Sequence, residues 1–483
     1  MAQAWWARKK SIDLLQQEYN TSKVDGQAMR RTLGLWQLTG IGLGGIIGVG
    51  IFVLTGIVAA TQAGPGVTYA FMLAGIASAA AALCYAEFAS MIPVAGSAYT
   101  YSYATMGEGV AWMIGWDLIL EYALVVAVVA IGWSGYAQAL LAHMGMPLPV
   151  ALSGAWDPEL GKMVDLPAVV ICLLLAFLLS LKTEMGARFN TVLVFVKLFA
   201  AILVIVAGVS YIDPANWDPF LPFGFWPHEV INADGTTTKV GVVAGAAVVF
   251  FAVFGYDTLT TAAEESKNPQ RDLPLAVVMS LGIALVLYVA MSLVLTGIVP
   301  YTTLNNAAPV AHAFDAIGLP WVTIVVSIAA VAGITSVIFA FMLACARITF
   351  AMSRDGLLPR WLSVLHPEHR TPQRPTMIVG VVTAVVAGIF PIGKIAELVN
   401  MGTLSAFVLI CAAVLLLRKQ RPELHRGFRV PLVPVIPIVG IGFSLWLMSS
   451  LPVATWHAFG IWLGIGAVVY LGYGKNRSLL AGK

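Results

Sequence analysis

The chain has 483 residues, of which 59% are hydrophobic and only 11% are charged. Soluble domains carry about 25% charged residues, so this chain has too little polar surface to face water and must have lipid as its main solvent. The formal net charge of +3 is small, and the basic residues are spread between apolar segments, which excludes a nucleic-acid-binding surface. The four cysteines each lie within an apolar run, without metal-ligand spacing, so we expect neither a metal site nor a disulfide.

Apolar runs of roughly 20 residues, long enough to cross a bilayer, recur along the chain. We predict twelve membrane-spanning helices, at 38–60, 66–91, 110–142, 165–181, 189–211, 241–262, 273–299, 321–353, 376–391, 395–417, 430–450 and 452–473. The runs are continuous rather than alternating, which excludes the strands of a membrane β-barrel. The first 34 residues are polar, so we expect no cleavable signal peptide.

The basic residues predict the orientation of the chain. With twelve spans, all but four of the 27 lysines and arginines fall on one side of the membrane or in the termini on that side; the exceptions are Lys162, Lys197, Lys239 and Lys394. Cytoplasmic loops carry the excess of basic residues. We therefore expect a multi-pass protein of the cell membrane with both termini in the cytoplasm.

The first span is unusually rich in glycine, with six glycines among residues 40–50. Each one weakens a helix by about 1 kcal/mol relative to alanine. Gly44 and Gly48 have the spacing of a close helix–helix contact, which is one explanation. The other is a broken helix whose freed amide groups bind an anionic group, and the additional Gly45 and Gly50 exceed what packing needs.

The sixth span carries a matching irregularity, because Gly255 and the acidic Asp257 fall at membrane depth. Spans 1 and 6 begin two halves of five spans each, at 38–211 and 241–417. A repeat with an odd number of spans inserts in opposite orientations, and interruptions at corresponding positions indicate the binding site of a transporter. The pairing favours the broken-helix explanation. A segment at 1–37, a final pair of spans at 430–473 and a tail at 474–483 complete the predicted organisation.

Short motifs in a fixed order along the chain resemble one transporter family. They are IIGVGIF at 46–52, YAEF at 85–88, PVAGSAY at 93–99, GWDL at 115–118, AEESKNPQRD at 263–272 and SRDGLLP at 353–359. Together they resemble the amino acid–polyamine–organocation (APC) superfamily, and within it the bacterial cationic amino acid transporter branch, from about residue 33 to 418. The resemblance implies an all-α membrane protein with a five-plus-five inverted repeat, two added C-terminal helices and proton-coupled amino acid uptake.

The resemblance also implies a substrate site at the two breaks. The substrate carboxylate is expected at the backbone amides of Ile46, Gly48, Val49 and Gly50, and the amino group at the backbone carbonyls of Phe251, Ala252 and Phe254. Helix-terminus electrostatics agree, since a half-helix N-terminus favours an anion and exposed carbonyls favour a cation. Many family members have serine or threonine where this chain has Val49, so a hydroxyl contact is missing here.

Lys197, Glu121 and Asp257 lie within the predicted spans, where a charge costs at least ~2.5 kcal/mol and indicates a function. Lys197 lies deep in span 5; it is either a proton carrier or half of a structural ion pair, and the resemblance implies that it replaces a bound sodium ion and contacts the break in span 1. Glu121 and Asp257 form either a proton or gating network or a structural hydrogen bond. Glu87, near the predicted cytoplasmic end of span 2, is better explained as structural.

Phe341 on span 8 corresponds to the family position that faces the substrate side chain. Members that carry long cationic substrates are expected to have a small residue there, so phenylalanine predicts a preference for small or medium neutral amino acids such as alanine.

A cationic amino acid or polyamine exchanger is the alternative; a channel or a membrane-embedded enzyme is disfavoured, because neither a filter repeat nor a catalytic constellation is present. The expected partners are an amino acid, a proton and the lipid bilayer, without nucleic acid or cofactor; a homo-oligomer or a small single-span partner stays open.

Overall fold

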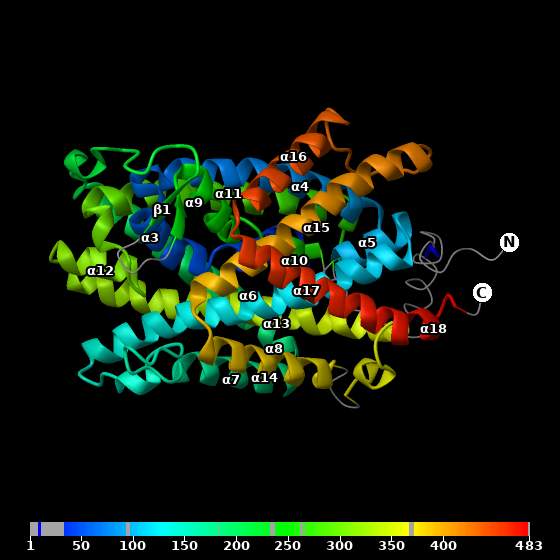
Figure 1. Cartoon of the computed structure of the whole chain (residues 1–483), viewed down its shortest axis with the longest axis horizontal. Coiled ribbons are helices and arrows are strands. Elements are labelled where there is room, and N and C mark those ends of the chain that lie inside the picture. The colour runs from blue at the N-terminus through cyan, green and yellow to red at the C-terminus, as the bar shows by residue number, and fades with distance from the viewer. Residues whose placement is uncertain are drawn as a thin grey trace.

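The computed structural model describes residues 8–10, 33–92, 97–181, 183–231, 237–260, 263, 266–366 and 371–481, and for residues 181 and 183–191 it describes the backbone alone. Parts of the predicted terminal segments 1–37 and 474–483 therefore lie outside the described residues. The described chain is almost entirely helical (Figure 1). The prediction of an all-α protein with many spans is confirmed.

Each of the twelve predicted spans coincides with a helix or a broken helix. The elements are α2 (Leu35–Ile46) with α3 (Thr55–Val58), α4 (Val67–Met91), α6 (Glu108–His143), α7 (Leu166–Leu181), α8 (Thr183–Val209), α9 (Val242–Val249) with α10 (Asp257–Thr260), α11 (Pro269–Ile298), α13 (Pro320–Arg354), α14 (Gln373–Ile389), α15 (Ile392–Gln420), α16 (Val435–Ser450) and α17 (Val453–Val469). By length and composition alone, eight helical segments of the described chain are long and apolar enough to cross a membrane. One of them, Gly50–Met91, contains the second predicted span and the last part of the first. Three shorter apolar helices lie at Leu166–Ser180, Gln373–Ile389 and Val435–Ser450.

The predicted ends differ from the observed ones by a few residues. The largest differences are at α8, which begins at Thr183 instead of 189, and at α16, which begins at Val435 instead of 430. Residues 430–434 are apolar but contain Pro431 and Pro434. A proline inside a helix removes a hydrogen bond, so the helix starts only after the second one.

Several short elements lie in regions that the sequence analysis left as connections. They are α5 (Ser97–Thr105), α12 (Pro309–Ala316), α18 (Lys475–Arg477) and an antiparallel hairpin of β1 (His228–Ile231) with β2 (Thr237–Val240), in which His228 pairs with Val240. Figure 1 shows α5 and α18 together at one end of the bundle, and α12 and β1 at the other end. None of these segments is long enough to give a periodic signal in the sequence.

Both predicted helix breaks are present. Helix α2 ends at Ile46, Ile47 is extended, and a wide helical turn starts at Gly50. Helix α9 ends at Val249, a short 3-10 turn covers Phe250–Ala252, and α10 begins at Asp257. The long helices α6 and α13 pack along each other beside these breaks, as α4 does along α11 and α7 along α14 (Figure 1).

The described ends of the chain meet at the same end of the bundle, which we call the N/C end. Arg8 donates a hydrogen bond to the carbonyl of Lys475 (3.3 Å), and Lys10 forms an ion pair with Asp355 (3.1 Å). The buried Glu108 carboxylate at the start of α6 accepts hydrogen bonds from the hydroxyls of Tyr103, Tyr470 and Ser478. Both termini on one side agrees with an even number of spans.

A buried carboxylate joins α4 to the segment after α15, also at the N/C end. Glu87 is 1% exposed and accepts two hydrogen bonds from Arg418 (2.6 and 3.1 Å), one from Arg426 (3.2 Å) and one from the amide of Val430 (2.7 Å). The structural interpretation of Glu87 therefore agrees with its contacts.

Replacing Glu87 with alanine should strongly destabilise the fold, because two guanidinium groups and a buried amide would lose their acceptor. Breaking a buried ion pair on one side costs about 3–5 kcal/mol, so the midpoint of thermal unfolding in detergent should fall clearly. The control is Glu229→Ala, which removes an exposed carboxylate from the β1–β2 hairpin. Equal midpoints for the two variants would show that the Glu87 contacts contribute little to stability.

Candidate substrate-binding site

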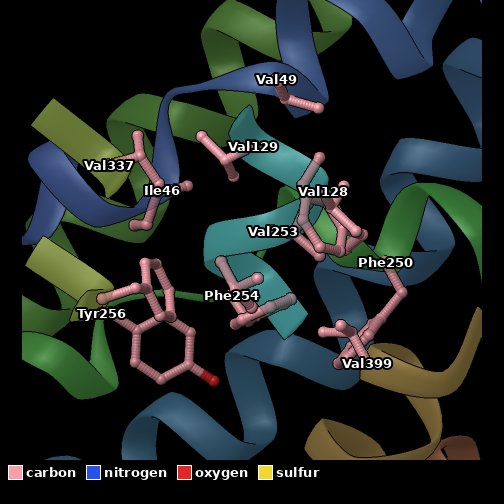
Figure 2. Close-up of a cluster of buried hydrophobic side chains, with 14 of the residues drawn as sticks. Ile46, Val49, Val128, Val129, Phe250, Val253, Phe254, Tyr256, Val337 and Val399 are labelled. Carbon is pink, nitrogen blue, oxygen red and sulfur yellow. The ribbon is translucent and has the colours of Figure 1, made fainter. Parts of the chain in front are cut away.

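A small cavity lies where the two broken helices cross, between α6 and α13. Its lining residues are Gly45, Ile46, Gly48, Val49 and Gly50 from the first break, Phe251 and Phe254 from the second, Val125 and Val129 from α6, and Val337 and Phe341 from α13. Figure 2 shows Ile46, Val129 and Val337 close together, with Phe254 nearby. The space open to the centre of a water molecule is about 10 Å³, which admits at most one water. Side chains of the lining must therefore move before an amino acid can enter.

Seven of the eight predicted substrate-binding residues line this cavity: Ile46, Gly48, Val49, Gly50, Phe251, Phe254 and Phe341. The eighth, Ala252, does not line it but lies directly against Gly50. A Cβ placed on Gly50 would come within 2.3 Å of the Ala252 Cβ. The two breaks are thus brought together, while their role in binding stays a prediction.

The sequence analysis missed four lining residues, Gly45, Val125, Val129 and Val337. The three valines lie in continuous apolar helices, where nothing in the local sequence separates a cavity-facing valine from a core valine. Gly45 is part of the glycine-rich stretch and meets Gly255 of the second break, since a Cβ on Gly45 would lie 2.7 Å from the Gly255 carbonyl oxygen. Gly255 has φ +113°, a backbone conformation that favours glycine.

The first break has separated donor and acceptor ends. A new helical segment begins after the extended Ile47, so its first N–H groups have no partner within the helix and carry the positive end of the helix dipole. The carbonyls before the break are bonded from outside by buried side chains. The Tyr288 hydroxyl of α11 donates to the Ile46 carbonyl before the break (2.7 Å). After the break, the Tyr136 hydroxyl of α6 donates to the Phe52 carbonyl (2.7 Å).

Lys197 donates two more hydrogen bonds to carbonyls at the first break. Its ammonium group is fully buried and donates to the carbonyls of Gly44 and Ile47, both at 2.6 Å, and to the Ser336 hydroxyl at 3.0 Å. The expected contact with the break in span 1 is therefore present. No carboxylate pairs with Lys197 in the part of the chain that the structure describes, so its contacts differ from those of the structural ion pair considered above. Ser336 was not singled out, because a serine in an apolar helix is common.

The second break has its own donor. The Asn400 side chain on α15 is fully buried and donates to the carbonyls of Ala247 (2.7 Å) and Val248 (3.2 Å), where α9 ends. This residue also escaped the sequence analysis. An asparagine inside an apolar run could have been noticed, because a polar amide at membrane depth needs a partner.

Glu121 and Asp257 lie buried on the N/C side of the cavity, together with Asp117. The Tyr122 hydroxyl donates to Asp257, and the Ser405 hydroxyl donates to Asp117 (2.6 Å). Each of the three carboxyl groups also has one buried oxygen without a hydrogen-bond partner among the described residues. A carboxyl group with a missing donor is easier to bury when it carries its own proton.

Phe341 connects the cavity to this carboxyl cluster. Its ring makes edge contacts with the rings of Phe254 (centroids 5.9 Å apart) and Tyr122 (5.3 Å). Tyr122 in turn bonds Asp257. Phe341 therefore contacts both the cavity and a hydrogen-bond donor of a buried acid.

The site combines apolar walls with backbone polar groups. Its side chains are valines, an isoleucine and phenylalanines, and no ionisable side chain lines it. No cluster of three or more potential metal-ligating residues occurs among the described residues. Such a site can bind a compact molecule that has polar groups at one end and an apolar body at the other.

Known sequences identify the family. The family described as amino acid permease matches residues 33–470 of this chain. The chain belongs to the amino acid permease family. A methylthioribose transporter of Bacillus subtilis (strain 168) is 46% identical over 98% of both chains, and the branched-chain amino acid permease BcaP of the same organism is 44% identical over 98% of both. The permease BcaP of Lactococcus lactis subsp. cremoris (strain MG1363) is 36% identical over 90% of this chain and 93% of its own.

Family membership confirms the resemblance found in the sequence. This permease is a multi-pass membrane transporter of the APC superfamily and not an enzyme. The broken helices α2–α3 and α9–α10 fit that fold.

Replacing Gly50 with alanine should already abolish substrate binding, and Gly50→Leu should do so too, because the new Cβ would collide with Ala252 and force the two breaks apart. Binding is measured by isothermal titration with the purified protein. Gly40→Ala is the matched control, since a Cβ at Gly40 meets nothing within 4 Å. Unchanged binding in both Gly50 variants would place the substrate site elsewhere.

Proposed function

We propose that this permease is a proton-coupled carrier of small or medium neutral amino acids that works by alternating access. It would lie in the cell membrane with both termini in the cytoplasm, and residues 38–211 and 241–417 would form its two inverted repeats. The observation that carries the proposal is the cavity at the crossing of the two broken helices, with backbone polar groups at its ends and apolar side chains around it.

The substrate backbone would lie between the two breaks. Its carboxylate would meet the amide groups after Ile47, at the positive end of a helical segment. Its ammonium group would meet the carbonyls of Phe251, Ala252 and Phe254. The side chain would then point toward Val129, Val337 and Phe341, which suits alanine or a branched aliphatic chain. The names of the two BcaP relatives support the same class of substrate.

Methylthioribose is a second candidate, because the relative that is 46% identical is named for its transport. This sugar has several hydroxyl groups and lacks both the carboxylate and the ammonium group of an amino acid. Only backbone groups could satisfy its hydroxyls here, since the side chains that line the cavity are apolar. Burying hydroxyls without partners is costly, so we favour the amino acid.

Cationic substrates and polyamines are disfavoured for a related reason. Their distal charge would enter an apolar pocket that has no carboxylate in its lining. The acids on the N/C side are separated from the cavity by Phe341 and Tyr122. A channel is disfavoured because paired helix breaks around one closed cavity suit a single binding site.

Lys197 would act as the proton carrier. A charged ammonium group has three N–H donors, and Lys197 has three acceptors: Gly44, Ile47 and Ser336. The neutral amine has only two N–H donors, so losing the proton would release at least one of these oxygens. Proton exchange would in this way loosen the link between the first break and helices α8 and α13. Glu121 and Asp257 would provide a second proton site.

Counterflow in proteoliposomes tests the proposed function. Vesicles loaded with unlabelled leucine should accumulate external labelled leucine, because a carrier alternates around one site whereas a channel does not. Unlabelled alanine and leucine should compete, while arginine and methylthioribose should not. Competition by methylthioribose alone would replace the amino acid with the sugar as the substrate.

Lys197→Met should abolish amino acid accumulation driven by a pH gradient while the protein still inserts, because methionine is easier to bury than an ammonium group. Uptake is measured in proteoliposomes with the inside alkaline. Lys162→Met, which changes a partly exposed lysine on a connecting segment, serves as the control. If the Lys197 variant accumulated substrate and responded to pH as the parent does, its proposed coupling role would be wrong.

Phe341→Ser should widen the pocket and raise arginine uptake relative to alanine uptake, because the serine removes the ring that fills the side-chain end. Competition assays with both substrates measure the ratio. Phe339→Ser makes the same change on the same helix at a position outside the cavity lining, and should leave the ratio unchanged. A parent protein that already prefers arginine would refute the assignment of Phe341.

A further inference from the structure

A second cavity, of about 180 Å³, lies at the N/C end, on the connection from α15 to α16. Its lining residues are Arg418, Pro422, Arg426 and Arg429. It is separate from the substrate cavity, and the proposed function makes no use of it. Three guanidinium groups around one open cavity need an explanation, because like charges repel unless something neutralises them.

The described carboxylates neutralise only part of this charge. Glu87 serves both Arg418 and Arg426, so one negative charge faces two positive ones. The other donors of Arg426 are taken up by the carbonyls of Arg421, Pro422 and Leu424. Glu423 forms its own ion pair with Arg421 (2.5 Å).

Two donor groups therefore face the cavity without a partner among the described residues. Arg418 uses its Nε and one terminal nitrogen on Glu87, which leaves its Nη1 without an acceptor in this part of the chain. Arg429 is exposed and has no hydrogen bond or ion pair with any described residue. The lining thus has unsatisfied guanidinium donors and a local excess of positive charge.

Exposed apolar side chains follow the lining residues of this cavity in the sequence. Leu432 is 75% exposed and Val435 is 56% exposed, and both follow Arg429 within six residues. Apolar side chains this exposed on a membrane protein have lipid tails as their natural surroundings. The basic cavity lies next to them in the sequence, at the start of α16, where the polar headgroups of the same leaflet would be.

We propose that Arg418 and Arg429 bind the phosphate of an anionic phospholipid headgroup, whose acyl chains lie along the exposed face at the start of α16. A guanidinium group matches phosphate oxygens in a bidentate geometry, and basic pockets beside membrane helices are suited to anionic lipids. The bound lipid would hold the α15–α16 connection against Glu87. It would thereby stabilise the C-terminal part of α4, which lies at the N/C end of the bundle.

Thermal unfolding of the full chain in detergent, with short-chain lipid added, tests this site. Dioctanoyl phosphatidylglycerol should raise the unfolding midpoint by about 3 °C at a concentration well above its dissociation constant, because a ligand that binds the folded state stabilises it. Dioctanoyl phosphatidylcholine should not, since its net charge is zero. An equal rise with both lipids would overturn the proposal in favour of unspecific tail binding.

Variants separate this site from other basic surfaces. Arg429→Gln should require about tenfold more phosphatidylglycerol for the same shift, which is the effect of losing one charged hydrogen bond. Arg429 is chosen because it does not pair with Glu87, so the variant should fold as the parent does. Arg360→Gln, an exposed arginine outside the cavity, is the matched control and should not change the titration. Equal titrations for the parent and Arg429→Gln would overturn the site.

A third arm uses inorganic phosphate without lipid. A rise that inorganic phosphate reproduces in full, and that Arg429→Gln removes, would support the phosphate site but overturn the lipid as its ligand. No rise with inorganic phosphate, together with a rise for phosphatidylglycerol, would support the lipid. These outcomes do not depend on which solute the permease carries.

Discussion

Lipid offers no hydrogen bonds, so every backbone N–H and C=O group at membrane depth must find its partner inside the protein. An unbroken helix satisfies these groups by itself, but the two helix breaks leave several of them without a partner in the helix. The surrounding side chains supply the missing partners. Lys197 and Tyr288 bond carbonyls of the first break, Tyr136 bonds the Phe52 carbonyl in the helical turn after it, and Asn400 bonds the carbonyls at the end of α9. Buried polar side chains that look isolated in the sequence are therefore the partners of exposed backbone.

In this arrangement, different helices hold the breaks in place and close the cavity. Side chains of α8, α11 and α15 donate hydrogen bonds to the carbonyls of the breaks and hold the breaks in place. Apolar side chains of α6 and α13 form the opposite wall of the cavity. Glycine at positions 45 and 255 lets the two breaks touch through their backbones. Phe341 then connects the cavity with Tyr122 and Asp257.

The sequence was most informative at residues that are unusual in a membrane helix. Six glycines in one span, a lysine within an apolar run and an acid beside Gly255 each conflict with an ordinary membrane helix, and each lies at or beside the breaks. Val125, Val129 and Val337 could not be predicted, because each lies among similar apolar residues of α6 or α13 and only tertiary packing decides which of these face the cavity. The start of α16 was misplaced because hydrophobicity alone does not detect that prolines 431 and 434 delay the helix. The roles of Asn400 and Ser336 could not be predicted, because their hydrogen-bond partners, the Ala247 carbonyl and Lys197, lie far away along the chain.

The meeting of the two chain ends limits how this permease can be labelled. Glu108 accepts the Ser478 hydroxyl, the Leu479 amide bonds the Asp355 carbonyl, and Lys10 pairs with the side chain of Asp355. A fluorescent protein or affinity tag joined directly to Leu480 would pull on the same small cluster that anchors the N-terminal segment. Fusions at either end should therefore carry a flexible spacer and keep residues 8–10 and 478–480 intact, whereas the exposed β1–β2 hairpin accepts a short epitope without loading that cluster.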